Sequence, residues 1–119
     1  MRHILLAGIV FIAMLYGCRS QADTKAPAGV IPRDSMISLM AAIELNEAAL
    51  KIQQTNINRD SLNKLSVRSY DSVYSYYRSS PQRFKISLDY YQNNLDDFQK
   101  MIDEVILRLI QQRDSLQHH

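Results

Sequence analysis

Apolar residues follow two kinds of pattern along this chain of 119 residues. Residues 4–15 form a single apolar run, whereas the rest of the chain mixes apolar and polar positions with helical spacing. From Pro32 onward one such face contains Met36, Leu39, Met40, Ile43 and Leu50. Because this spacing places them on one side of a helix, and because proline suits the first helical turn, the pattern predicts a helix from Pro32 to near Gln53.

Two more helices are expected before residue 94. The polar stretch Thr55–Asp60 separates the first of them from the preceding helix, and Asp60 or Ser61 is suited to cap it. Its apolar face contains Leu62, Leu65, Ser69, Val73 and Tyr76. Ser80-Pro81 then predicts a helix start, since serine caps helices and proline fits the first helical position. The face of this third helix contains Phe84, Leu88 and Tyr91.

The last helix has the most regular pattern. Asn94 can cap it, and its apolar stripe contains Leu95, Phe98, Ile102, Val105, Leu109, Gln112 and Leu116. Such a stripe either faces the core of a small bundle or forms a coiled-coil seam for self-association. The coiled coil is an option because the stripe covers three heptads, the shortest run that indicates a coiled coil. Ile106 and Ile110 widen the apolar face and favour packing inside the domain, and Gln112 is polar within the seam.

These segments predict an all-α fold, a small bundle of three or four helices over residues 31–116. The composition agrees, because the chain has only 3 glycines and 3 prolines, the residues that most often interrupt helices. A chain of this size holds one domain.

The first eighteen residues predict export. A basic start, an apolar run too short to span a bilayer, and Gly17 before Cys18 form a secretory signal over residues 1–17. Cys18 directly after Gly17 resembles the bacterial lipobox, in which the cysteine becomes the lipid-carrying first residue of the mature chain. Residues 18–30 then form a flexible tether. We therefore expect lipid attachment at Cys18 and a domain anchored in the bacterial cell envelope, at the outer membrane and facing the periplasm.

Charge and composition exclude several functions. The chain has 14 basic and 12 acidic residues, and no basic cluster that would bind nucleic acid. His3 belongs to the signal, and the other histidines are the terminal pair His118 and His119, so we expect no metal site and no cofactor. Without a histidine base or glycine-rich loops, the sequence offers no nucleophile pair or phosphate loop, and we expect no catalytic residues and no enzyme.

Glu47 is the one acidic residue with an unusual position. It lies within the apolar stripe of the first helix, where a carboxylate needs a hydrogen-bond partner or has a raised pKa. Arg68 or a tyrosine of the next helix can supply that partner. A ligand contact at Glu47 is the alternative.

Tyrosines are the other compositional signal, since 7 are present and no tryptophan. Tyr70, Tyr74 and Tyr77 are spaced as one ridge on a helix. Such a ridge either packs between helices with its hydroxyls at the rim, or grips a peptide or sugar ring.

From about residue 30 to residue 109 the chain also resembles a family of small Bacteroidetes lipoproteins, domain of unknown function 4296. Three segments carry the resemblance: Ile31-Pro32 with Glu47-Ala48, then Tyr70-Asp71-Ser72-Val73, and finally Phe84-x-x-Ser87-Leu88-x-Tyr90-Tyr91 followed by Ile102-Asp103-x-Val105 and Leu109. The resemblance implies a small, helical, lipid-anchored protein and brings no activity with it.

Two functions remain open from the sequence. One is a non-catalytic module that docks an envelope protein, through the tyrosine ridge or the last helix. The other is a protein that binds or modifies an envelope glycan, using the tyrosine ridge and Glu47. Self-association through the last helix is compatible with either.

Overall fold

The computed structural model describes residues 26–118, which form four α-helices and, within that range, no strand. They are α2 (Arg33–Gln53), α3 (Arg59–Tyr76), α4 (Pro81–Gln92) and α5 (Leu95–Gln117). The all-α fold expected from the sequence is confirmed. The expected signal peptide, Cys18 and the first part of the tether lie outside the described residues.

Local capping determines where three of the helices begin. Ser80 Oγ accepts a hydrogen bond from the backbone N–H of Arg83, and Pro81 is the first residue of α4, as expected. Asn94 Oδ1 accepts from the N–H of Asp97 at the start of α5, also as expected. The predicted cap of α3 is wrong: Asn58, rather than Asp60 or Ser61, accepts from the N–H of Ser61 at 2.9 Å.

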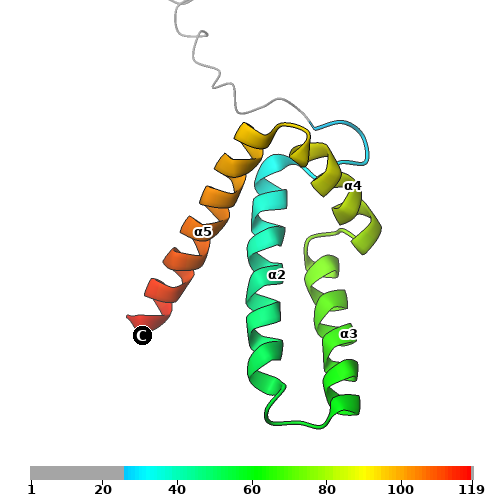
Figure 1. The fold of residues 1–119 in the computed structure, drawn as a ribbon, viewed down its shortest axis with the longest axis vertical. Helices are drawn as coiled ribbons and strands as arrows, with labels where there is room; N and C mark the ends of the chain where they lie inside the picture. Colours follow the sequence, from blue (N-terminus) through cyan, green and yellow to red (C-terminus); the bar gives the residue numbers. More distant parts are fainter. Residues whose placement is uncertain (1–25, 119) are drawn as a thin grey trace, which may run out of the picture.

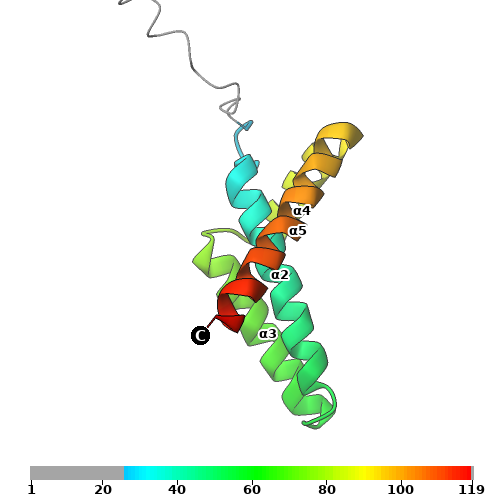
Figure 2. The ribbon, with the colours of Figure 1, turned by 90° about the vertical axis from the view of Figure 1, so that its left-hand side faces the viewer.

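The four helices are arranged around α2 (Figure 1). The chain turns back after α2, so that α3 runs antiparallel along one side of it. The shorter α4 lies near the N-terminal end of α2, and α5 then returns along the other side, parallel to α2. Turning the molecule by 90° shows that α5 crosses α2 rather than following it along its whole length (Figure 2).

The core lies between the first half of α2 and the middle of α5. Its buried members are Ile31, Met36, Ile37, Leu39, Ala41, Met101 and Val105. Partly buried apolar side chains from α3 and α4 complete it, among them Val73, Phe84, Leu88 and Tyr91. Every helix therefore contributes to one core, which is centred on the N-terminal half of α2.

Several side chains predicted to face the core do not. Tyr76 is 81% exposed, although its neighbours Val73, Tyr74 and Tyr77 pack against the core. Ile106 and Ile110, expected to pack inside the domain, are 50% and 41% exposed. Both ends of the α5 stripe are also open, with Leu95 at 74% and Leu116 at 77%. Only the middle of that stripe is covered. Leu95 is the first residue of α5, and toward its C-terminus α5 separates from α2 (Figure 1).

Among the described residues, none of the helices combines the length and the hydropathy that a membrane crossing requires.

Candidate functional site

The backbone of Ile31 is held by two side chains of α4. The N–H of Ile31 donates to Ser87 Oγ at 2.8 Å, and the hydroxyl of Tyr91 donates to the carbonyl oxygen of Ile31 at 2.6 Å. Ser87 Oγ in turn donates to the carbonyl of Arg83, one turn earlier in α4, at 2.7 Å. Ile31, Ser87 and Tyr91 are called the Ile31 latch below.

Because the Ile31 latch is buried, its polar groups need one another as hydrogen-bond partners. Ser87 is fully buried and Ile31 nearly so, so neither the N–H of Ile31 nor the serine hydroxyl can turn to water instead. A buried polar group without a partner destabilises a fold, which means that each member of the latch depends on the others. Burial also raises the pKa of the Tyr91 hydroxyl, which extends to higher pH the range in which it stays protonated and donates to Ile31.

Polar contacts between α2 and α5 set how these two helices meet. Arg33 forms a 2.8 Å ion pair with Glu104, and Arg108 donates to Ser38 Oγ and to the carbonyl of Asp34. The hydrogen bond with Arg33 holds the pKa of Glu104 below its ordinary value. Pairing residue 33 with 104 and residue 38 with 108 fixes a parallel register between the two helices.

Glu47 and Tyr70 form the polar pair that the sequence allowed. The Tyr70 hydroxyl donates to Glu47 Oε1 at 3.0 Å, linking α3 to α2. Glu47 is exposed rather than buried in the apolar stripe. Burial and the bond to Glu47 together raise the pKa of Tyr70. The pair therefore joins two helices at the surface of the molecule.

The other two tyrosines of the predicted ridge are used in packing. Tyr74 and Tyr77 are both partly buried against the core, and the Tyr74 ring lies 6.1 Å from that of Phe84 in a tilted arrangement. Burial raises the pKa of Tyr74. Of the ridge, Tyr70 has its hydroxyl engaged and the other two have their rings packed against the core.

Apolar side chains remain exposed where α2 and α5 separate. In the parallel register, residue 116 would lie beside residue 45 or 46 if the two helices stayed in contact. Leu45 and Leu116 are both largely exposed instead, and so is Ile52 near the end of α2. The part of α5 beyond Leu109 is exposed throughout, and its apolar surface is thus uncovered.

Residues that could hold a metal ion do not gather in the part of the chain that the structure describes. No group of three or more histidine, cysteine, aspartate or glutamate side chains converges there. The hollow lined by Asn63, Lys64, Val67 and Arg68 lies on the open surface of α3 and encloses nothing. Cys18, the expected site of lipid attachment, lies outside the described residues.

The Ile31 latch was missed as a site by reasoning from residues alone. Tyr91 was predicted only as part of the apolar face of α4, and Ser87 was noted only in the family resemblance, so neither was assigned a hydrogen-bonding role. One signal was available: Ser87 lies one turn from both Phe84 and Tyr91, so that a serine occupies the apolar face of α4. A polar side chain in that position needs a buried partner.

Comparison with known proteins gives one match. A family model described as a domain of unknown function (DUF4296) matches residues 27–115, which include all four helices almost to the end of α5. No curated protein and no solved structure matches the chain.

Proposed function

The chain belongs to the DUF4296 family, as the sequence resemblance indicated, and from that premise we propose that it is a bacterial lipoprotein. In this proposal Cys18 carries the lipid, the helical domain faces the periplasm from the outer membrane, and the domain acts as a non-catalytic module that docks another protein of the cell envelope. The partner is recognised by surface, without chemistry on a substrate.

The observation that carries the anchoring half of this proposal is the Ile31 latch. Residues 18–30 separate Cys18 from the domain, and Ile31 is the residue at which that segment enters the core. Both polar atoms of the Ile31 backbone are bound by α4, 56 and 60 residues further along the chain. A domain suspended by its N-terminus needs a firm attachment at this position, and the latch provides one.

Support for a non-catalytic role comes from how the polar side chains are used. Ser87 and Tyr91 hold the chain entry, Glu47 and Tyr70 join two helices, and Glu104 pairs with a cation of α2. Each of these groups is engaged in holding the fold. The packing of Tyr74 and Tyr77 also removes much of the open aromatic surface on which glycan recognition would depend.

Metabolic labelling with a clickable fatty acid tests the anchor. The wild-type chain should take up the label and Cys18→Ser should not. The double variant Cys18→Ser/Ser20→Cys is the matched control, because it keeps one thiol but moves it two residues further from Gly17; it should also remain unlabelled. Labelling of Cys18→Ser, or an unlabelled wild-type chain, would refute the lipoprotein assignment.

Crosslinking in native membranes, followed by capture of the full-length chain, tests the docking role. One envelope protein should be enriched with the wild-type chain and absent with Cys18→Ser. Recovery of only murein fragments and further copies of the chain itself would refute docking of a different protein. The two experiments fail independently, because the first reads the lipid and the second reads the partner.

A further inference from the structure

α5 carries a second face that points away from the core. Six residues follow one another along it at alternating steps of four and three, which places them in a single row on the helix. All six are exposed: Gln99, Asp103, Ile106, Ile110, Arg113 and Gln117. This set is called the outer seam below, and it differs from the stripe that the sequence predicted, whose middle packs against α2.

The order of residue types along the outer seam is the same from either end, except that the two charged residues have opposite signs. A glutamine, a charged residue and an isoleucine are followed by an isoleucine, a charged residue and a glutamine. When a second α5 is placed antiparallel to the first, related by a two-fold axis midway between Ile106 and Ile110, Ile106 of each copy lies opposite Ile110 of the other. The same operation places Asp103 of each copy opposite Arg113 of the second copy.

From this self-complementarity we propose that two copies of the chain pair through an antiparallel contact between their outer seams. The two-fold operation makes both partners use the same patch, as closed homodimers do. Two isoleucine pairs form the centre, and two Asp103–Arg113 ion pairs flank them. A parallel pairing would set Asp103 against Asp103 and Arg113 against Arg113, so the charges select the antiparallel orientation.

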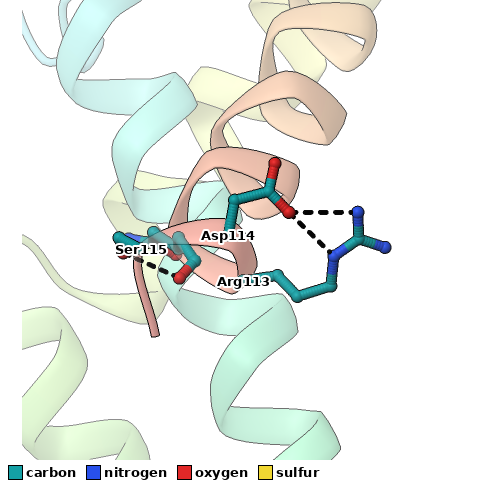
Figure 3. Close-up of polar contacts among 4 residues, drawn as sticks. Arg113, Asp114 and Ser115 are labelled. Atoms are coloured by element: carbon teal, nitrogen blue, oxygen red, sulfur yellow. Dashed lines mark hydrogen bonds and ion pairs between the residues drawn. The ribbon is translucent and has the colours of Figure 1, made fainter. Parts of the chain in front are cut away.

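The present partners of the two charged residues leave them available for this contact. Asp103 accepts a hydrogen bond from Gln99 at 3.2 Å, within the outer seam itself. Arg113 reaches only its neighbour Asp114, at 3.2 Å, with its guanidinium extended from the helix (Figure 3). Exposed ion pairs of this kind contribute little free energy, so Arg113 can leave Asp114 and pair with Asp103 of a second copy at little cost in free energy.

Closure of α5 onto α2 does not account for the outer seam. Such a closure would cover the side of α5 that already packs against α2. Met101 and Val105 are already buried on the core side of α5, and Ile106 and Ile110 lie on a different side of the helix. A helix with apolar residues on two sides needs a second surface to cover them, and a second α5 supplies one of matching charge.

The expected contact is small. The outer seam spans 19 residues, which at the rise of an α-helix is about 27 Å. An interface made by one helix from each copy falls at the weak end of the range for protein complexes. Pairing should therefore respond strongly to local concentration and, if the chain is membrane-anchored, should be favoured by confinement to a surface.

Charge reversal tests the pairing on the full-length chain in mild detergent, by analytical ultracentrifugation over a concentration series. Asp103→Arg and Arg113→Asp each place like charges at both flanks, and each should weaken self-association by roughly tenfold. An equimolar mixture of the two variants restores opposite charges at both flanks, so it should associate as the wild-type chain does. Both residues are exposed, so circular dichroism should show an unchanged fold.

Two further measurements make the result specific to the outer seam. Lys64→Asp changes the net charge by as much as Arg113→Asp but lies on the exposed surface of α3, and it should leave association unchanged. Gln99→Cys should form a disulfide with Gln117→Cys when the two variants are mixed, and neither should crosslink at these positions with itself. A wild-type chain that stays single, or a mixture that associates no better than its components, overturns the proposal.

Discussion

Replacing Ser87 with alanine tests the Ile31 latch most directly. The substitution removes the acceptor of the Ile31 N–H in a site without access to water. A buried donor left without a partner costs about 1–3 kcal/mol, and the better helix propensity of alanine returns up to about 0.5 kcal/mol. The free energy of unfolding should therefore fall by about 0.5–3 kcal/mol.

The assay is thermal and urea unfolding of the purified chain, followed by circular dichroism at the helix band. For a domain of this size 1 kcal/mol corresponds to about 4–8 °C, so Tm should fall by about 2–24 °C. Ser72→Ala is the matched control, because Ser72 also donates to a carbonyl one turn earlier, at 2.9 Å, but is exposed and accepts no distant N–H. Equal stability of the Ser87→Ala and Ser72→Ala variants would refute the reasoning.

The same latch predicts a sensitivity to alkaline pH. Burial makes the pKa of Tyr91 higher in the folded chain than in the unfolded one. Its contribution is therefore complete below the unfolded value near pH 10 and is lost as pH rises through the folded pKa. Tyr91→Phe should be less stable than the wild type at neutral pH, and the difference should shrink as the pH rises. A constant difference across that range would contradict the role of the hydroxyl.

The remaining predictions concern the core, the ion pair and the turn before the latch. Met101→Ala opens a cavity in the core and should lower the free energy of unfolding by about 2–5 kcal/mol in urea titrations, whereas Leu116→Ala should change it by less than about 0.5 kcal/mol. Arg33 lowers the pKa of Glu104, so this ion pair stabilises the fold above the unfolded pKa near 4.3, and the stabilisation is lost as pH falls through the folded pKa. Because both side chains are about 40% exposed, Glu104→Gln should reduce the acid-dependent change in the free energy of unfolding by less than about 1 kcal/mol. Gly29 has a φ of 85°, so Gly29→Ala should destabilise the chain by about 1 kcal/mol by calorimetry even though open space surrounds the added methyl.

Features that depend on neighbouring residues were predictable from the sequence. The starts of α4 and α5 follow from Ser80-Pro81 and from Asn94, because a cap requires only a side chain and the next helical turn. The start of α3 was less certain in principle, since several residues near it are good caps. Asn58 is the one whose extended backbone, with ψ at 163°, aims its side chain at the helix. That conformation depends on the turn before α3, and the apolar spacing within α3 gives no information about that turn.

Features that depend on distant residues were not predictable. The exposed ends of the α5 stripe result from how α5 crosses α2, and helical spacing is the same in a covered stripe and an open one. The role of Ser87 depends on a backbone N–H 56 residues earlier in the chain. For Glu47 the sequence narrowed the partner to a short set on the next helix, and the three-dimensional arrangement selected Tyr70.

The Ile31 latch also determines how a mechanical load would travel through the molecule. A pull on the segment before Val30 arrives at Ile31, two residues before α2 begins. Without the latch, that tension would act along the axis of α2 and unwind its first turn. The bonds to Ser87 and Tyr91 pass part of it to α4, and both must break before Ile31 separates from that helix. Resistance of the domain to pulling from its N-terminus is thus set by a short helix that is not adjacent to that segment in the chain.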